Sequence, residues 1–165
     1  LNDLLLDITT QLQSESQYVP SEIMFDDLPM IEADAANFRQ LFQNLIENGL
    51  KYNNSKLPAV RIHLEHRNDH ILLIVTDNGI GIEKKYREQI FEMFKRLHHQ
   101  EEYKGTGVGL AICKKIVQMY NGLIWVKGNP KGGSVFYIKL PNIILATHSS
   151  EATETPTTVS LSSAI

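Results

Sequence analysis

The stretch NLIENGLKY, residues 44–52, is the part of the chain that best predicts its fold and chemistry. It ends a helix that we expect to begin after the N-cap Asp34 and to reach about Tyr52. Apolar residues and one glycine recur there at steps of three and four and predict a buried stripe: Phe38, Leu41, Phe42, Leu45, Ile46, Gly49 and Leu50. Beside it, a second set shares one narrow face of the helix: Asn44, Asn48, Lys51 and Tyr52.

This second set has the side chains that a magnesium nucleotide needs. Amide oxygens are hard ligands that suit Mg²⁺, a lysine neutralises phosphate, and a tyrosine stacks on a base or packs beside a ribose. Polar stripes occur on most surface helices, however. Taken alone, the pattern therefore favours a solvated helix face.

A second motif, residues 77–82, follows a strand expected at residues 70–76, whose apolar run is typical of a central strand covered on both faces. Asp77 at the strand's end can accept a hydrogen bond from an amino group such as that of adenine. Gly79 and Gly81 let the backbone turn sharply and approach a ligand closely. An ordinary Asn-Gly turn would explain Asn78 and Gly79 but gives no reason for Gly81.

A third motif, residues 105–110, opens a helix expected from about Gly107 to Tyr120. Free backbone N–H groups at a helix start bind anions, and glycines let phosphate oxygens come near. No strand pattern precedes the motif and no Gly-Lys-Ser/Thr follows it, so it is neither the dinucleotide fingerprint nor the Walker loop. A merely flexible helix entry is the less favoured alternative, because three alternate glycines cost helix stability.

Between these motifs, residues 83–104 are highly charged and contain Phe91 and Phe94. Glycines at both ends are typical of a mobile lid, anchored at its start by the two phenylalanines. The structural alternative is a short surface helix with Phe91 and Phe94 in the core, and both interpretations are compatible.

The remaining segments predict a helix over residues 1–13 and strands over 21–25, 60–64, 123–127 and 134–140. We expect a two-layer α/β (α+β) sandwich, with helices on one side of a mixed, mostly antiparallel sheet, over residues 1–141. Residues 142–165 contain ten Ser or Thr and no Lys or Arg, which indicates a mobile C-terminal tail.

Composition excludes several classes of function. The net charge of -3 gives no general attraction to nucleic acid or to an anionic membrane. One cysteine allows no internal disulfide and fits a reducing, cytoplasmic compartment. No apolar run approaches the roughly 20 residues of a membrane span, so we expect no direct membrane contact. The first residue is not Met, and we expect an excised piece of a larger protein.

In their order and text, these pieces resemble the catalytic domain of sensor histidine kinases, within the family shared with DNA gyrase, a heat-shock chaperone and MutL. Five segments carry the resemblance: residues 44–52 (N box), 77–81 (G1 box), 91–94 (F box), 105–110 (G2 box) and 132–136 (last strand, ending at Leu140-Pro141). Four boxes in the right order are a specific signal over residues 1–141. Residues 94–98 and 111–117 look most like kinases of the phytochrome and PAS-sensor type.

The resemblance implies the Bergerat ATP-binding fold and a role for each matched residue. Asn48 would bind Mg²⁺, with Asn44 near the phosphates or the metal. Lys51 would contact phosphate, Tyr52 would flank the adenine or ribose, and Asp77 would accept from the adenine amine. Gly79 and Gly81 would shape the floor, and Gly105, Gly107 and Gly109 would hold the phosphates. The other residues that it places around ATP are Ile82, Phe94, Thr106, Val108 and Leu110, with Arg96 near the γ-phosphate.

One departure is Gly49, where alanine is usual; it costs helix stability but removes no chemistry. The family's ATPases generally carry a water-activating Glu at the position of Asn44, and an amide is no useful general base. Phosphoryl transfer to a histidine is therefore favoured over hydrolysis. Catalysis would rest on Asn48, Lys51 and Arg96.

No histidine of the chain has the context of the family's acceptor. The resemblance therefore implies a dimerisation and histidine-phosphotransfer domain outside the chain, connected through residues 1–13, and a downstream response regulator. Without that domain the fragment should be mainly monomeric. The alternatives are a serine kinase of the anti-sigma type and a non-catalytic module that binds nucleotide or partners.

Overall fold

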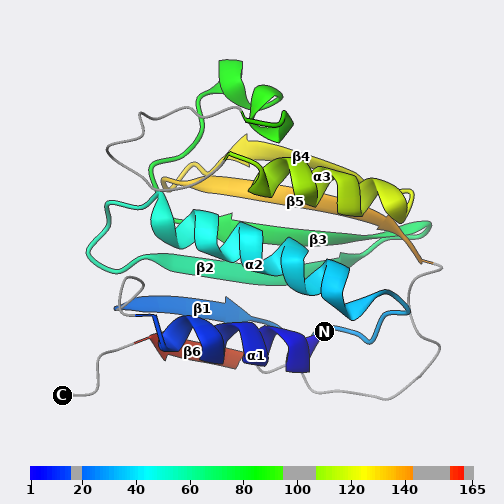
Figure 1. Cartoon of the computed structure of the whole chain (residues 1–165), viewed down its shortest axis with the longest axis horizontal. Coiled ribbons are helices and arrows are strands. Elements are labelled where there is room, and N and C mark those ends of the chain that lie inside the picture. The colour runs from blue at the N-terminus through cyan, green and yellow to red at the C-terminus, as the bar shows by residue number, and fades with distance from the viewer. Residues whose placement is uncertain (16–19, 95–106, 143–156, 162–165) are drawn as a thin grey trace.

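The computed structural model describes residues 1–15, 20–94, 107–142 and 157–161. In these ranges the chain forms three α-helices and two short 3-10 helices: α1 (Asn2–Gln13), α2 (Ala35–Lys51), η2 (Lys84–Tyr86), η3 (Gln89–Phe91) and α3 (Gly109–Met119). Six strands accompany them: β1 (Ser21–Phe25), β2 (Ala59–His66), β3 (His70–Asp77), β4 (Leu123–Gly128), β5 (Ser134–Pro141) and β6 (Thr157–Leu161). Figure 1 shows their arrangement.

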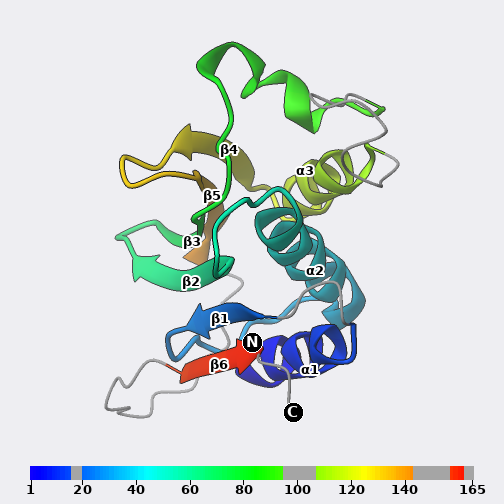
Figure 2. The ribbon, with the colours of Figure 1, turned by 90° about the vertical axis from the view of Figure 1, so that its left-hand side faces the viewer.

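The strands form one mixed sheet in the order β4-β5-β3-β2-β1-β6. Only β1 and β2 run parallel, and the other four neighbouring pairs are antiparallel. The helices α1, α2 and α3 all lie on one face of this sheet (Figure 2). The prediction of a two-layer sandwich with a mixed, mostly antiparallel sheet is therefore confirmed.

The long helix α2 follows the predicted pattern closely. Its N-cap is Asp34, whose carboxylate accepts a hydrogen bond from the backbone N–H of Asn37 at 2.9 Å. This bond satisfies one of the N–H groups that a helix start leaves free. The buried residues of α2 are those of the predicted stripe: Phe38, Leu41, Phe42, Leu45, Ile46, Gly49 and Leu50.

The strand β3 is central, since it pairs with both β2 and β5. Its helix-facing apolar residues, Ile71, Leu73 and Val75, are at most 2% exposed. Among the described helices none covers the other face, so the expected coverage on both faces is wrong. Ile74 on that face is nevertheless only 5% exposed, and the register places it between His63 of β2 and Tyr137 of β5. Neighbouring side chains within the sheet thus replace a second helical layer.

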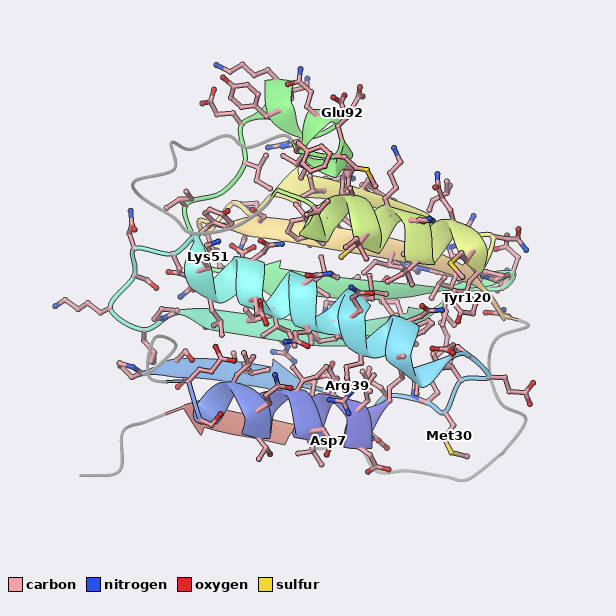
Figure 3. The ribbon with its side chains drawn as sticks, viewed as in Figure 1. Asp7, Met30, Arg39, Lys51, Glu92 and Tyr120 are labelled. Carbon is pink, nitrogen blue, oxygen red and sulfur yellow. The ribbon has the colours of Figure 1, made fainter. Side chains whose placement is uncertain are left out.

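The first helix, α1, packs beside α2 and extends the core under β1. Leu5, Ile8 and Leu12 of α1 are at most 1% exposed. At the surface, Asp7 of α1 and Arg39 of α2 form an ion pair of 2.9 Å, labelled in Figure 3. Exposed ion pairs of this kind contribute about 0–1 kcal/mol, so apolar burial holds α1 in place.

The C-terminal region departs from its prediction. Thr157–Leu161 form the edge strand β6, whose five residues pair antiparallel with Ser21–Phe25 of β1. No strand was predicted in this segment, which was expected to be a mobile tail.

Candidate functional site

Asp77 is the centre of the candidate site. It ends β3 and is 8% exposed, and its Oδ1 accepts hydrogen bonds from the backbone N–H groups of Gly79 at 2.9 Å and Ser134 at 3.0 Å. Burial raises the pKa of the Asp77 carboxyl above its usual value, and these two bonds oppose the shift. A buried carboxylate with one oxygen saturated by backbone donors is prepared to receive a further donor at Oδ2.

Glycines surround this carboxylate because no side chain fits there. A Cβ atom on Gly133 would overlap the backbone carbonyl of Asp77, and one on Gly79 would overlap the carbonyl oxygen of Tyr52. Gly81 has a φ of +76° and packs on the carbonyl oxygen of Gly133. The turn after β3, the end of α2 and the β4–β5 turn therefore meet at Asp77, which explains the glycine at 81 that a simple turn left unexplained.

The polar residues at the C-terminal end of α2 lie on the helix-covered side of the sheet, beside the turn after β3. Asn48, Lys51 and Tyr52 are half-buried, and the Lys51 Nζ lies 5.0 Å from the centroid of the Tyr52 ring. The Tyr52 carbonyl accepts from the backbone N–H of Ile80 at 3.0 Å, which joins the two motifs directly. Figure 3 shows Lys51 at this end of the helix.

Asn44 lies one turn earlier and faces the start of α3. A Cβ on Gly109 would come within 3.0 Å of the Asn44 Oδ1. The Asn44 Nδ2 is buried beside the thiol of Cys113 on α3. The structure therefore brings residues of the N and G2 boxes into contact.

The start of α3 falls two residues later than predicted. The helix begins at Gly109, after Val108, whose apolar side chain makes no capping bond. Gly107 has a φ of +71° and Leu110 is half-buried against the core. The first backbone N–H groups of α3 therefore receive no capping bond from the side chain of Val108. The predicted residues Arg96, Gly105 and Thr106 lie outside the described residues.

The two phenylalanines of the F box have different environments. Phe91 is 7% exposed, and its ring packs edge-on against Phe136 of β5 at a centroid distance of 6.4 Å. Phe94 is 76% exposed, with a φ of +62° that non-glycine residues rarely adopt. Its backbone N–H donates to the carbonyl of Gly107 at 3.0 Å. The structural alternative, which placed both rings in the core, is therefore wrong for Phe94.

Ile82 and Arg87 connect the G1 box to the segment before the F box. The half-buried Ile82 packs against the core, and its carbonyl accepts from the Arg87 Nε at 3.1 Å. The other end of the guanidinium lies against Gly128, where an added Cβ would stand 2.7 Å from it. Arg87 therefore ties this segment to the end of β4.

Sequence reasoning missed three contributors to the site. Gly133 and Ser134 contact Asp77, although their motif served only to identify the last strand. Gly49 was interpreted as part of the buried stripe and as a cost to helix stability, but not as a neighbour of Asp77, yet an added Cβ would stand 3.0 Å from the Asp77 Cβ. A glycine inside an otherwise regular helix is the signal that indicated such a close approach.

The residues present fit a magnesium nucleotide. The described part of the chain has no group of three His, Cys, Asp or Glu that could hold a metal ion by itself. Mg²⁺ typically takes one or two protein oxygens and completes its shell with water and substrate phosphates. Asn48 can supply such an oxygen, and the buried carboxylate of Asp77 can accept a hydrogen bond from an amino group.

Residues 33–144 match the family described as histidine kinase-, DNA gyrase B- and HSP90-like ATPases, and the chain belongs to this family. The phytochrome-like protein Cph1 of Synechocystis sp. is 46% identical over 121 residues, which cover 73% of this chain and 16% of Cph1. The adaptive-response sensory kinase SasA of Synechocystis sp. is 39% identical over 115 residues, which cover 70% of this chain and 30% of SasA. The chain thus spans less than a third of these relatives.

Solved structures agree. The catalytic domain of the histidine kinase ThkA superposes with a TM-score of 0.70 at 26% identity, over 86% of this chain and 93% of that one. Full-length ShkA in complex with AMPPNP superposes with a TM-score of 0.72 at 25% identity, over 90% of this chain and 30% of that one. The domain is therefore an ATP-binding domain homologous to the catalytic part of sensor histidine kinases. In the described residues, no helix combines the length and hydropathy of a membrane span.

Proposed function

We propose that this domain binds Mg·ATP and donates the γ-phosphoryl group to a histidine on a separate dimerisation domain. The observation that carries the proposal is the convergence on one site of Asp77, the glycine turns and the polar end of α2. A base-recognising carboxylate on one side and phosphate-binding groups on the other match the two ends of a nucleotide.

On the base side, Asp77 recognises the adenine amine. Its Oδ1 is held by Gly79 and Ser134, so the adenine N–H donates to Oδ2. Because the carboxylate is buried, this charge-assisted bond is strong and selects a base that carries an amino group. Tyr52 flanks the adenine or ribose, and Gly79, Gly81 and Ile82 form the floor.

On the phosphate side, Asn48 is the magnesium ligand and Lys51 neutralises phosphate charge. Bound Mg²⁺ supplies charge neutralisation on the phosphate oxygens. Asn44 lies where α2 meets α3, beside the glycine-rich start of that helix. Gly105, Thr106, Gly107, Val108, Gly109 and Leu110 supply backbone N–H groups, and Arg96 contacts the γ-phosphate. Phe94 lies at the edge of this phosphate region.

Transfer to a histidine is favoured over hydrolysis. Asn44 stands where a hydrolase of this family carries its general base, and an amide cannot take a proton from water. The nearest acid along α2, Glu47, accepts a hydrogen bond from the Gln43 Nε2 at 2.8 Å on the outer part of the helix. One oxygen of its carboxylate is thus engaged by Gln43.

The proposal includes partners outside the chain: a dimerisation and phosphotransfer domain that precedes α1, and a response regulator that receives the phosphoryl group. The isolated domain is then monomeric and works in the cytoplasm. The alternatives are an anti-sigma-type serine kinase and a non-catalytic nucleotide-binding module of the same fold. Both bind ATP, so only transfer assays distinguish them.

Calorimetric titration with a non-hydrolysable ATP analogue, with and without Mg²⁺, tests the first half of the proposal. We expect magnesium to strengthen binding in the wild type and to have little effect in Asn48→Ala. Gln40→Ala is a matched control, because it removes an exposed amide two turns earlier on α2. Absence of binding under every condition contradicts the proposal.

The second half needs an acceptor. The domain is mixed with a dimerisation hairpin from a related kinase, and radioactive phosphate from γ-labelled ATP is followed onto that hairpin. Acid-labile labelling that depends on the acceptor histidine supports the kinase. Binding without any transfer to histidine hairpins favours the non-catalytic alternative, and acid-stable labelling of serine favours the anti-sigma type.

A further inference from the structure

The side-chain amides of two asparagines connect the N box with the G1 box. Neither asparagine is among the residues proposed to touch a nucleotide. Asn53 follows α2 directly, one residue after Tyr52, and Asn78 follows Asp77 in the turn after β3. The Asn53 Nδ2 donates to the Asn78 Oδ1 at 2.7 Å and to the carbonyl of Gly49 at 3.0 Å. A single amide thus connects the last turn of α2 with the G1 turn.

Further hydrogen bonds orient both amides. The Asn53 Oδ1 accepts from the backbone N–H of Ser55 at 3.0 Å, so its amino group must face Asn78. The Asn78 Oδ1 also accepts from the N–H of Ala59 at 2.8 Å, while its Nδ2 donates to the carbonyl of Leu57 at 3.0 Å. Asn53 therefore acts as the donor of the pair and Asn78 as the acceptor.

The pair lies between the two halves of the proposed site. On one side are Lys51 and Tyr52, and on the other are Asp77 and Gly79. The turn sits directly on the end of α2, since a Cβ at Gly79 would overlap the Tyr52 carbonyl and the Ile80 N–H donates to that carbonyl at 3.0 Å. A change in the asparagine pair would therefore shift Asp77 relative to Tyr52 and Lys51.

We propose that Asn53 and Asn78 are positioning residues of the nucleotide site, which hold Asp77 at the distance from the end of α2 that adenine recognition requires. The inference rests on the proposed function, because it assigns to the pair the geometry of that same site. It predicts an effect on base selectivity, which a role in loop stability alone would not produce.

The test compares ADP with inosine diphosphate, in which an oxo group replaces the adenine amine and N1 carries a hydrogen. Without magnesium, the two ligands differ only at this edge of the base, so their affinity ratio reports how the site recognises the edge that faces Asp77. We expect the wild type to prefer ADP. Asn53→Ala and Asn78→Ala should each weaken ADP binding about three- to tenfold, as expected for one misplaced hydrogen bond, and leave inosine diphosphate nearly unchanged. Asn68→Ala, an exposed amide in the β2–β3 turn, should keep the wild-type ratio.

Aspartate variants test the direction of the pair. Asn78→Asp loses the donor to the Leu57 carbonyl but keeps an acceptor for Asn53 and Ala59, so the preference for ADP should persist even if the variant weakens both ligands. Asn53→Asp places a carboxylate against two acceptor oxygens, the Gly49 carbonyl and the Asn78 Oδ1, and should abolish the preference. In the double alanine variant, the ratio of ADP affinity to inosine diphosphate affinity should fall no further than in either single variant, because the two residues act as a unit.

The outcomes separate the two proposals. If the wild type binds neither nucleotide, the proposed function fails and the positioning role fails with it. If the wild type prefers ADP but both alanine variants keep that preference, or lose both ligands equally, the positioning role alone is overturned. Should the alanine variants fail to fold, equal selectivity of the two aspartate variants overturns it.

Discussion

Gly49 of α2 lies directly against Asp77 of β3. A Cβ atom at Gly49 would stand 3.0 Å from the Asp77 Cβ and 2.7 Å from the Cγ2 of Val60, which is fully buried. The helix therefore approaches the sheet closely at the strand end that carries the candidate base-recognising carboxylate. Any side chain at this point displaces α2, Val60 or Asp77.

We expect Gly49→Ala to be destabilising, although alanine favours a helix by about 1 kcal/mol over glycine. Overpacking a well-filled core costs about 1–3 kcal/mol, which exceeds that gain. ADP affinity should fall as well, because Asp77 is displaced. Chemical denaturation and calorimetry measure the two effects.

The Gly49→Ala/Val60→Ala double variant is the matched control, since it removes the atom that the new methyl group meets. Its free energy of unfolding should be higher than the sum of the two single changes predicts, by about 0.5–3 kcal/mol. Strict additivity would show that Val60 is not the obstacle.

Asp77→Asn should raise the stability of the ligand-free domain and weaken its binding of ADP. The Asn oxygen would keep the bonds from Gly79 and Ser134, so its amino group would face the adenine amine, donor against donor. Loss of a charge-assisted bond weakens ADP binding about 10- to 100-fold. The ligand-free domain should melt at a higher temperature, because a buried charge is removed. An unchanged ADP affinity would contradict the assignment of Asp77.

The pH dependence follows from the raised pKa of Asp77. The protonated carboxyl stabilises the folded domain below the ordinary pKa of 3.8, and this contribution is lost as the pH rises through the folded pKa. ADP affinity should have the opposite pH dependence, because the adenine amine donates its hydrogen bond to the ionised carboxylate of Asp77. Affinity should therefore fall on acidification at a pH above the ordinary aspartate range. In Asp77→Asn this loss should be absent.

The F box allows a paired test of core and surface. Phe91→Ala removes a buried ring that contacts Phe136 and should lower the free energy of unfolding by about 3–5 kcal/mol. Phe94→Ala removes a ring that is 76% exposed and should change it by less than about 0.5 kcal/mol. Urea denaturation of both variants measures the difference, and similar losses would contradict the placement of Phe94.

Cys113 offers a probe of global unfolding. It is the chain's single cysteine and is 0% exposed, and burial raises the pKa of its thiol to about 12. Because the thiolate is the reactive form, a thiol reagent such as Ellman's reagent should react at neutral pH only with unfolded molecules. The labelling rate should therefore rise with urea along the unfolding curve. Rapid labelling of the native domain would contradict this placement.

Periodicity predicted most of the architecture. The stripe on α2 is buried as expected. Its seven residues lie on one face of the helix, and they can all be removed from water only when that face packs against the core. The strands at residues 60–64 and 134–140 were likewise found within a residue or two of their observed bounds, since their alternation matches one covered face. The glycine motifs predicted the places where backbone segments meet.

The features that were wrong or missed depend on distant parts of the chain. The position of Ser134 beside Asp77 follows from the antiparallel pairing of β3 with β5, which no local pattern specifies. Thr157–Leu161 lack a strong apolar alternation, and only the edge of β1 gives them a partner. Phe94 carries the same aromatic signal as Phe91, and its exposure is decided by the backbone turn at its positive φ.

The hydrogen bond between the Phe94 N–H and the Gly107 carbonyl brings together the two points at which the chain leaves and rejoins the described fold. The interval between Phe94 and Gly107 therefore begins and ends at neighbouring points of the described fold. The entropy of closing a chain segment between two fixed points changes only slowly with its length, by about 0.6 kcal/mol for each doubling. Insertions or deletions between these two residues can accumulate during divergence while η3 and the start of α3 stay in place, so this interval is a natural site for variation in length or for grafting a foreign peptide.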